Sequence, residues 1–380
     1  MAIAILSSPD YLQPVYSIQE YELYDSANYS EAGFYYQLDV SVNGQSRTLK
    51  VKKDENNKAT FDVQAILQAF IESSIDETKL ESGSIFQAYT GTEYVTPYQV
   101  RASAIWDGGS SVGSYTSAKL VFNGVDQYNR TWDASLYEFR AGNSGLWITD
   151  YHGPRTIHFD DLYRLTCLYS GANGIDSSFN GVSYTRYQFN GDSSTQSYDT
   201  SIGTTDLAFF SIAADPSTLN AQWSGFIDEN TEYFTVAEST GLSETIRINI
   251  APLDSRYDRY YRFYYVGTLG QIEAFNFDLV PENDIKISRT TYSANRQYKT
   301  FGTKVDDEYL VRSNWICEDE SAGLKSLWHS PLIKIYEDNS MIPIVILDTS
   351  KKILNQHNSG GLISYTLNFK YADDYVVQFQ

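Results

Sequence analysis

Residues 256–277 read RYDRYYRFYYVGTLGQIEAFNF, and their first ten positions hold three arginines and five tyrosines. Such a stretch suits a nucleic-acid platform, a sugar-binding aromatic face or an ordinary pair of strands. Side chains alternate between the two faces of a strand, which places Arg262 and Tyr264 on one face. Residues 267–270, GTLG, provide glycine for a turn, and residues 271–277 return as a second strand. The pattern predicts a half-buried β-hairpin in which arginine stacks on tyrosine.

The charge of the chain argues against a nucleic-acid platform. The 380 residues include 28 Lys and Arg against 48 Asp and Glu, a net charge of −20. Residues 1–252 hold 14 basic and 31 acidic residues (−17), and residues 253–380 hold 14 and 17 (−3). A surface this acidic repels phosphate backbones, so we expect no direct nucleic-acid binding.

The composition of the chain favours strands over helices. It has 32 tyrosines and 19 phenylalanines but only two methionines, and aromatic side chains suit pleated, half-buried surfaces. We predict a mostly β fold, with several β-sandwich-like domains in tandem and two short helices. Cys167 and Cys317 are too few and too far apart in sequence for a disulfide framework or a zinc pattern.

Shifts in composition and charge divide the chain into three predicted domains. Residues 1–140 form an N-terminal β domain that ends in an aromatic-rich connector. Residues 141–252 form an acidic β domain with long polar loops, and residues 253–380 form a C-terminal β domain. Each domain is large enough to bury its own core.

Two segments have the features of helices. The first is predicted at about residues 62–73, with Asp62 as its cap and apolar side chains at helical spacing: Val63, Ile66, Leu67, Phe70 and Ile71. The second is predicted at about residues 317–329. It begins with three consecutive acidic residues, which favour the positive end of the helix dipole.

Few residues suggest catalytic or metal chemistry. The chain has no GxGxxG, P-loop or HExxH motif. His152 and His158 lie near Asp160 and Asp161, but their spacing fits no standard metal site. Adjacent carboxylates on a strand point to opposite faces, so the acidic pairs do not suit glycoside hydrolysis. We therefore expect no catalytic residue, no cofactor and no metal ligand, and we do not expect an enzyme.

Several stretches resemble a family of virion structural proteins of tailed bacteriophages that infect Bacteroidetes-type hosts. The resemblance covers the predicted N- and C-terminal domains, and the central domain matches much less well. It rests on SSPDYLQPVYSIQEYELYDS, EAGFYYQLDVSVNG, FDVQAILQAFI, YRFYYVGTLGQIEAFNFDL, VRSNWICEDESAGLKSLWHSPLIKIYEDNSMIPIVILDTS and LISYTLNFKYADDY. It implies a tail or baseplate protein and carries no catalytic residues.

These observations lead us to expect a structural tail, baseplate or tail-tip protein that forms a symmetric oligomer and docks on other tail proteins. The expected location is the virion tail, after synthesis in the cytoplasm of the bacterial host. No segment is long and apolar enough to span a membrane. Aromatic and arginine side chains favour interfaces, which suggests the following interface residues: Trp132, Tyr137, Trp147, Arg259, Tyr260 and Arg262.

Two other functions remain open. A receptor- or glycan-binding module would bind a host surface glycan through the polar loops at residues 170–181 and 190–202. A polysaccharide depolymerase is less favoured, because the chain has no recognisable nucleophile or metal motif.

Overall fold

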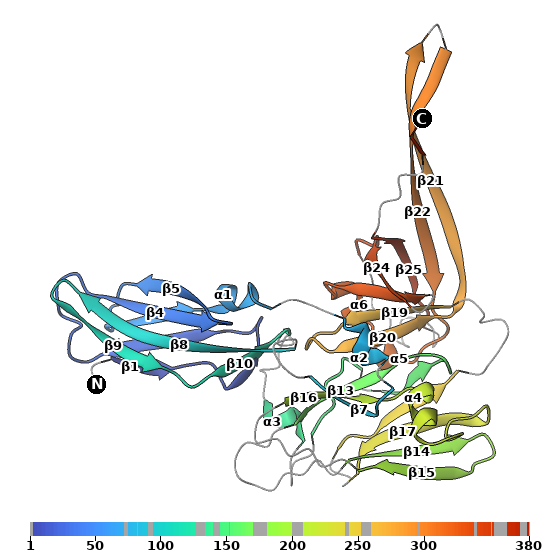
Figure 1. Cartoon of the computed structure of the whole chain (residues 1–380), viewed down its shortest axis with the longest axis horizontal. Coiled ribbons are helices and arrows are strands. Elements are labelled where there is room, and N and C mark those ends of the chain that lie inside the picture. The colour runs from blue at the N-terminus through green and yellow to red at the C-terminus, as the bar shows by residue number, and fades with distance from the viewer. Residues whose placement is uncertain are drawn as a thin grey trace. The chain divides into compact units, whose positions relative to one another are not determined.

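The computed structural model describes these residues: 3–71, 75–81, 83–89, 94–125, 134–139, 145–151, 153–169, 181–199, 208–239, 243–251, 260–294, 297–337, 340–350, 352, 363–372 and 378–379. The chain is mostly β and contains several sheets in tandem, which confirms the predicted fold class (Figure 1). It divides into two compact units. Unit 1 comprises Met1–Ser74, Ala88–Glu138 and Thr268–Gly270, and unit 2 comprises Ile75–Gln87, Phe139–Gly267 and Gln271–Gln380.

Unit 1 is built from two sheets that share one core. The first has the order β1 (Ile3–Ser7), β3 (Glu20–Asp25) and β6 (Lys58–Asp62). The second has the order β2 (Leu12–Pro14), β10 (Lys119–Phe122), β8 (Val95–Trp106), β4 (Tyr35–Val42) and β5 (Gln45–Val51), and β9 (Gly109–Tyr115) pairs with β8. Alternate residues of both sheets are buried together, including Tyr21, Leu23, Phe61, Tyr36, Leu38 and Val40. This interleaving gives a sandwich-like core.

The turn between β4 and β5 agrees with the sequence signal. Asn43 and Gly44 both have positive φ, 48° and 75°, as a two-residue hairpin turn requires. Val42 faces Gln45 across this turn, so every later pair of the two strands is in fixed register.

The first predicted helix is shorter than expected. Strand β6 extends through Asp62, and the Val63 N–H donates to Gln19 O at 3.0 Å, which holds the backbone against β3. Helix α1 therefore spans only Gln64–Gln68. The Asp62 carboxylate accepts from Gln64 N–H at 2.8 Å, although Val63 occupies the N-cap position. The predicted helix is present, but its first predicted residue, Asp62, belongs to strand β6.

Unit 2 contains three sheets. The first has the order β11 (Glu138–Phe139), β13 (Arg164–Tyr169), β16 (Ala208–Ala213) and β7 (Phe86–Ala88). The second has the order β12 (Arg155–Ile157), β18 (Ile246–Ile250), β17 (Thr231–Glu238), β14 (Val182–Gln188) and β15 (Ser193–Tyr198). The third has the order β20 (Ile272–Phe277), β19 (Tyr261–Val266), β23 (Ile333–Glu337), β24 (Ser340–Ile346), β25 (Thr366–Tyr371), β22 (Gln297–Arg312) and β21 (Leu279–Ala294), and β26 (Gln378–Phe379) pairs with β22.

The predicted domain boundaries relate to these units in different ways. The predicted boundary at 140 lies beside the change of unit between Glu138 and Phe139. The predicted boundary at 252 falls outside the described residues. The separation of residues 141–252 from residues 253–380 therefore stays a prediction, and both segments belong to unit 2.

The second predicted helix is two helices. Helix α5 spans Glu318–Gly323 and helix α6 spans Lys325–His329. Cys317 Sγ accepts from Glu320 N–H at 3.5 Å and the Glu320 carboxylate accepts from Cys317 N–H at 3.2 Å, which forms a capping box. The expectation of two helices was also too low, because α2 (Glu77–Leu80), α3 (Ala134–Tyr137) and α4 (Pro216–Gln222) are additional. Within the described residues, no helix has the length and apolar character needed to cross a membrane.

Candidate functional site

Residues 261–277 form the predicted hairpin, but most of its side chains are fully buried instead of half-buried. Strands β19 and β20 pair in antiparallel register, with Val266 opposite Ile272. On its other side β19 pairs with β23, and the side chains of Phe263, Tyr264 and Tyr265 are all buried. Because both faces of β19 are covered, these rings provide neither a base-stacking platform nor a sugar-binding face.

Arg262 forms a buried ion pair within the chain. Its side chain is 3% exposed, and Nη1 donates to Asp161 Oδ2 at 2.8 Å and to Asn276 Oδ1 at 2.9 Å. Its Nε donates to the Tyr264 hydroxyl at 3.1 Å, so the arginine does order a tyrosine. The expectation of a surface contact is wrong for Arg262, since its acidic neighbour belongs to the same chain.

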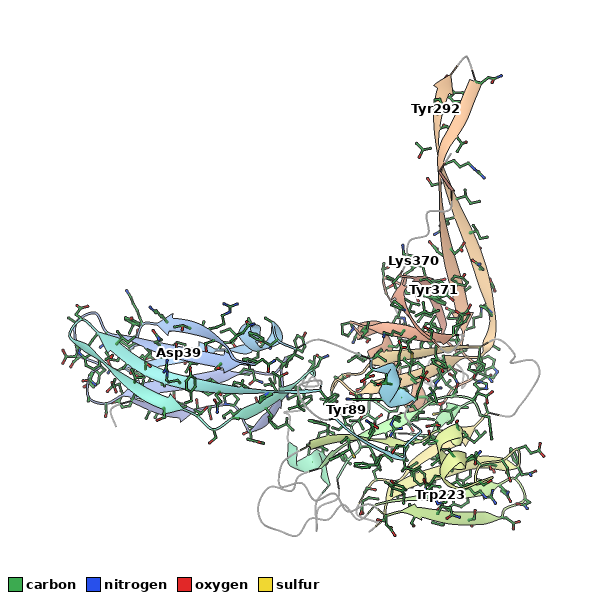
Figure 2. The ribbon with its side chains drawn as sticks, viewed as in Figure 1. Asp39, Tyr89, Trp223, Tyr292, Lys370 and Tyr371 are labelled. Carbon is green, nitrogen blue, oxygen red and sulfur yellow. The ribbon has the colours of Figure 1, made fainter. Side chains whose placement is uncertain are left out.

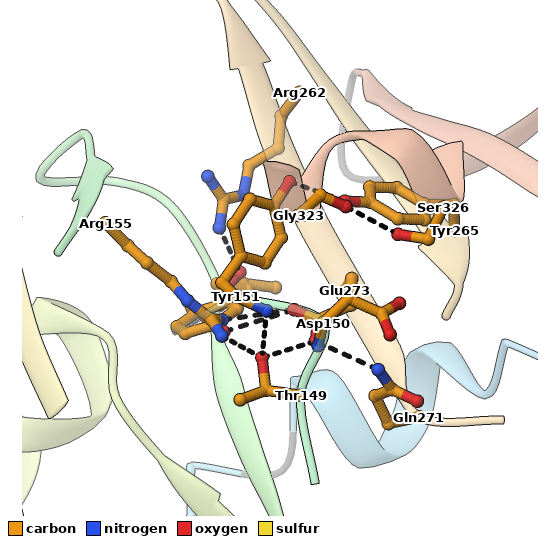
Figure 3. A network of polar contacts seen from close by, with 12 residues as sticks. Thr149, Asp150, Tyr151, Arg155, Arg262, Tyr265, Gln271, Glu273, Gly323 and Ser326 are labelled. Carbon is orange, nitrogen blue, oxygen red and sulfur yellow. Dashed lines mark hydrogen bonds and ion pairs between the residues drawn. The ribbon is translucent and has the colours of Figure 1, made fainter. Parts of the chain in front are cut away.

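A second polar network lies at the other end of the β20 strand (Figure 3). Arg155 Nη1 lies 3.1 Å from Glu273 Oε2, and both side chains are almost fully buried. Glu273 Oε1 also accepts from the Thr149 hydroxyl at 2.7 Å and from Asp150 N–H at 3.0 Å. A carboxylate with this many internal donors connects β12 to β20 and is not open to a ligand.

The other predicted interface residues differ in placement. Trp147 is 1% exposed and its indole N–H donates to Glu244 O at 2.8 Å, so the expectation that it is exposed is wrong. Tyr260 is half-buried, and its ring stacks on His158 with centroids 4.0 Å apart. Tyr137 is half-buried at the end of α3. Trp132 and Arg259 lie outside the described residues.

A small polar cavity opens beside the Arg262 network. Its volume is about 180 Å³, and its wall includes His158, Asp278, Glu320 and Trp315. His158 Nε2 lies 2.8 Å from Asp278 Oδ1, and burial raises the pKa of Glu320. The Trp315 side chain is 64% exposed. In the described part of the chain, no cluster of three or more His, Cys, Asp or Glu residues is arranged to hold a metal ion.

The expectation that the chain has no nucleophile motif was wrong, because one sequence match exists, although it lies in the wrong structural context. Residues 109–113, GSSVG, fit the pattern GxSxG, which positions a nucleophilic serine at a turn between a strand and a helix. Here the motif lies along β9, where Ser111 pairs with Ala104 of β8. The strand has no following helix to form a nucleophile elbow.

The most distinctive surface of unit 2 is a long two-stranded arm formed by β21 and β22, which projects beyond β24 and β25 (Figure 1). Each strand has 16 residues and therefore extends roughly 50 Å at about 3.3 Å per residue. Residues 282–293 are all exposed, including Ile285 at 59%, and Tyr298 on the other strand is 84% exposed. Tyr292 lies near the far end (Figure 2).

The base of the arm is held in the third sheet of unit 2. Strand β22 continues into register with β25, from Tyr309 opposite Phe369 to Arg312 opposite Thr366. The rings of Tyr309 and Phe369 stack with centroids 5.3 Å apart. Strand β21 forms the outer edge of this sheet, so its outward backbone groups have no strand partner among the described residues.

Sequence reasoning did not detect this arm. The acidic run Asp306, Asp307 and Glu308 gives no indication of a strand in the sequence, but it lies within β22. Both faces of β21 are exposed over residues 282–293, so this part of the sequence lacks the apolar and polar alternation that marks a half-buried strand. The available signal was a run of β-branched and aromatic residues between 285 and 305.

Comparison with known proteins does not assign a family. No family model matches the chain, and no curated protein matches it. A structure of the full extracellular region of Plexin A4 is similar at 8% identity and a TM-score of 0.17, over 97% of this chain and 36% of that one. A second structure of that region has 7% identity and a TM-score of 0.16, over 97% and 31%. The chain thus spans about a third of the plexin chains, and similarity this low supports no inference about function.

Proposed function

We propose that this chain is a structural component of a bacteriophage tail, at the baseplate or tail tip, and that it assembles with copies of itself and with other tail proteins. The observation that carries the proposal is the β21–β22 arm. Beyond its base, the described arm has a third strand only where β26 pairs with Gly302 and Thr303. A two-stranded ribbon is only marginally stable in water, and the apolar side chains and open edge of β21 are suited to pairing with another chain. In an assembly, a projecting arm of this kind can contact a neighbouring chain.

The internal architecture supports an assembly role over catalysis. The buried carboxylates of Asp161 and Glu273 each form an ion pair with an arginine, and these pairs connect different segments of unit 2. The resemblance of several stretches to virion structural proteins gives the proposal its location.

The test is detection of the chain in purified particles. Virions of a phage that encodes this sequence should contain it at a fixed stoichiometry by quantitative mass spectrometry. Antibody labelling should mark one end of the tail. Its absence from intact particles would overturn the proposal.

A glycan-binding role is the second candidate, and it rests on the cavity beside Trp315. An exposed indole next to Asn314, Asp278 and Glu320 has the aromatic face and polar groups that sugar binding uses. A glycan array distinguishes the two functions. The glycan-binding role would be favoured if the wild-type chain binds a glycan without assembling and the Trp315→Ala variant does not bind it.

A further inference from the structure

The charges of the β21–β22 arm are segregated along its length. Its distal part, residues 287–305, holds four basic residues and no acidic residue: Arg289, Arg296, Lys299 and Lys304. The rest of the chain has 24 basic against 48 acidic residues. The distal arm is therefore a basic segment on an otherwise strongly acidic protein.

The proximal part of the arm is net acidic, and both of its basic residues form ion pairs within the arm. Lys286 pairs with Glu308, and Arg312 Nη2 lies 2.8 Å from Glu282 Oε1. The distal ladder differs, because Thr303 faces Arg289, Ser288 faces Lys304 and Tyr292 faces Lys299. In the register of the two strands, the residues opposite these three cations are uncharged.

We propose that the distal arm docks on an acidic surface of a second copy of this chain. This inference rests on the proposed function and names the partner of the arm. Opposite charges attract the basic arm to a chain whose remainder is acidic, and the apolar side chains of Ile285, Ile287 and Tyr292 are exposed beside these charges. We place the arm and its receptor in a head-to-tail, heterologous contact, which generates a ring or a helical array, whereas a reciprocal exchange of arms would stop at a dimer.

A protein partner fits the arm better than a nucleic acid. The two exposed isoleucines suit a protein surface and contribute nothing to phosphate binding. The proximal arm also carries five acidic residues, which would repel a duplex that lay along it: Glu282, Asp284, Asp306, Asp307 and Glu308. Binding of DNA is therefore the competing outcome that the experiment must exclude.

The test compares two charge-reversal variants of the full chain. Arg289→Glu with Lys304→Glu changes the distal arm, and Arg47→Glu with Lys52→Glu makes the same charge change on exposed positions of unit 1. Sedimentation velocity at low and high NaCl measures self-association. We expect the wild type to associate more weakly at high salt. We expect the arm variant to associate at least about tenfold more weakly than the control variant.

Equal self-association of the arm variant and the control variant would overturn the inference. It would also be overturned if the arm variant loses binding of a labelled DNA duplex but self-associates like the control. Circular dichroism and thermal melting of both variants show whether they fold. The proposed function is tested separately by the presence of the chain in particles. If the chain is present in virions but the arm variant still self-associates, the inference about the arm is refuted and the proposed function is not.

Discussion

At the scale of single residues, the pair Asp161 and Arg262 is the strongest test of what holds unit 2 together. Removing one member of a buried ion pair leaves an uncompensated charge and costs about 3–5 kcal/mol. We expect Arg262→Met to lower the free energy of urea unfolding by this order of magnitude. The double variant Asp161→Asn with Arg262→Met should recover much of the loss.

The matched control is Arg47→Met, which removes an exposed arginine and should change the free energy of unfolding by less than about 0.5 kcal/mol. If Arg262→Met is as stable as this control, the ion pair is not the link that the geometry indicates. A double-mutant cycle over Asp161 and Arg262 then measures their coupling directly.

Asp215 gives a second test at this scale, through pH. Its side chain is fully buried at the N-cap of α4, where Oδ1 accepts from Thr218 N–H at 2.8 Å, and Oδ2 has no hydrogen-bond partner. Burial raises the pKa of Asp215 to about 6. The folded state then binds the proton more tightly than the unfolded state, whose pKa is about 4. The contribution of this group to stability is therefore present below pH 4 and is lost as pH rises through 6.

Asp215→Asn removes this titration and keeps an acceptor for Thr218, because asparagine caps helices as well as aspartate does. We expect the melting temperature of the variant, relative to wild type, to be higher at pH 8 than at pH 4. Thermal melts in the two buffers measure this difference. A pH-independent difference between the two proteins would show that Asp215 does not titrate in this range.

At the scale of elements, features that depend on local sequence were predictable, and features that depend on contacts with distant parts of the chain were not. The hairpin of β19 and β20 was predictable because its glycine turn and aromatic side chains are local signals. The burial of β19 on both faces was not, because the residues that cover it come from distant parts of the chain, such as Leu324 and Leu327 in one cluster and Ile75 and Leu80 in the other. The helix predicted at 62–73 was too long at both ends, because pairing with β3 holds Asp62 in a strand and the helix ends at Gln68, with Ala69 as its C-cap.

The interface residues show the same limit. Trp147 and Arg262 are residue types that favour interfaces, and here they are used inside unit 2. Composition indicates that a side chain prefers contact, but only the tertiary structure shows whether the contact lies within the chain or outside it. The arm escaped detection because residues 282–293 are exposed and therefore lack the pattern of a buried strand.

The arm yields a prediction at the element scale. Lys286 faces Asp306 across the ladder, so residues 287–305 can be replaced by a two-residue Asn-Gly turn. The removed part of β21 is exposed, and the base stays paired with β25. The deletion also removes Gly302 and Thr303, whose only loss of pairing is with the two-residue strand β26. We expect the shortened chain to keep the melting temperature of the wild type within a few degrees, as differential scanning calorimetry would measure. A large loss would mean that the distal arm supports the fold.

At the scale of the whole molecule, a heterologous contact predicts how mixed chains behave. The shortened chain lacks the basic arm but keeps the acidic surface that receives it. It should bind the arm of a wild-type copy and then offer no arm of its own, so it terminates growth. We expect small fractions of shortened chain to lower the size of wild-type assemblies far more than dilution does. Light scattering of mixtures at a fixed total concentration measures this effect.

The control for this experiment is the Arg47→Glu with Lys52→Glu chain, which has an intact arm and should join the assemblies without terminating them. A different symmetry gives a different result. If two arms bound each other, the shortened chain would be excluded, and assembly would fall only in proportion to the wild-type concentration. That proportional fall would contradict docking of the arm on an acidic surface. Termination at low fractions of the shortened chain would support it, because a chain without an arm can terminate growth only if it still carries the surface that receives the arm.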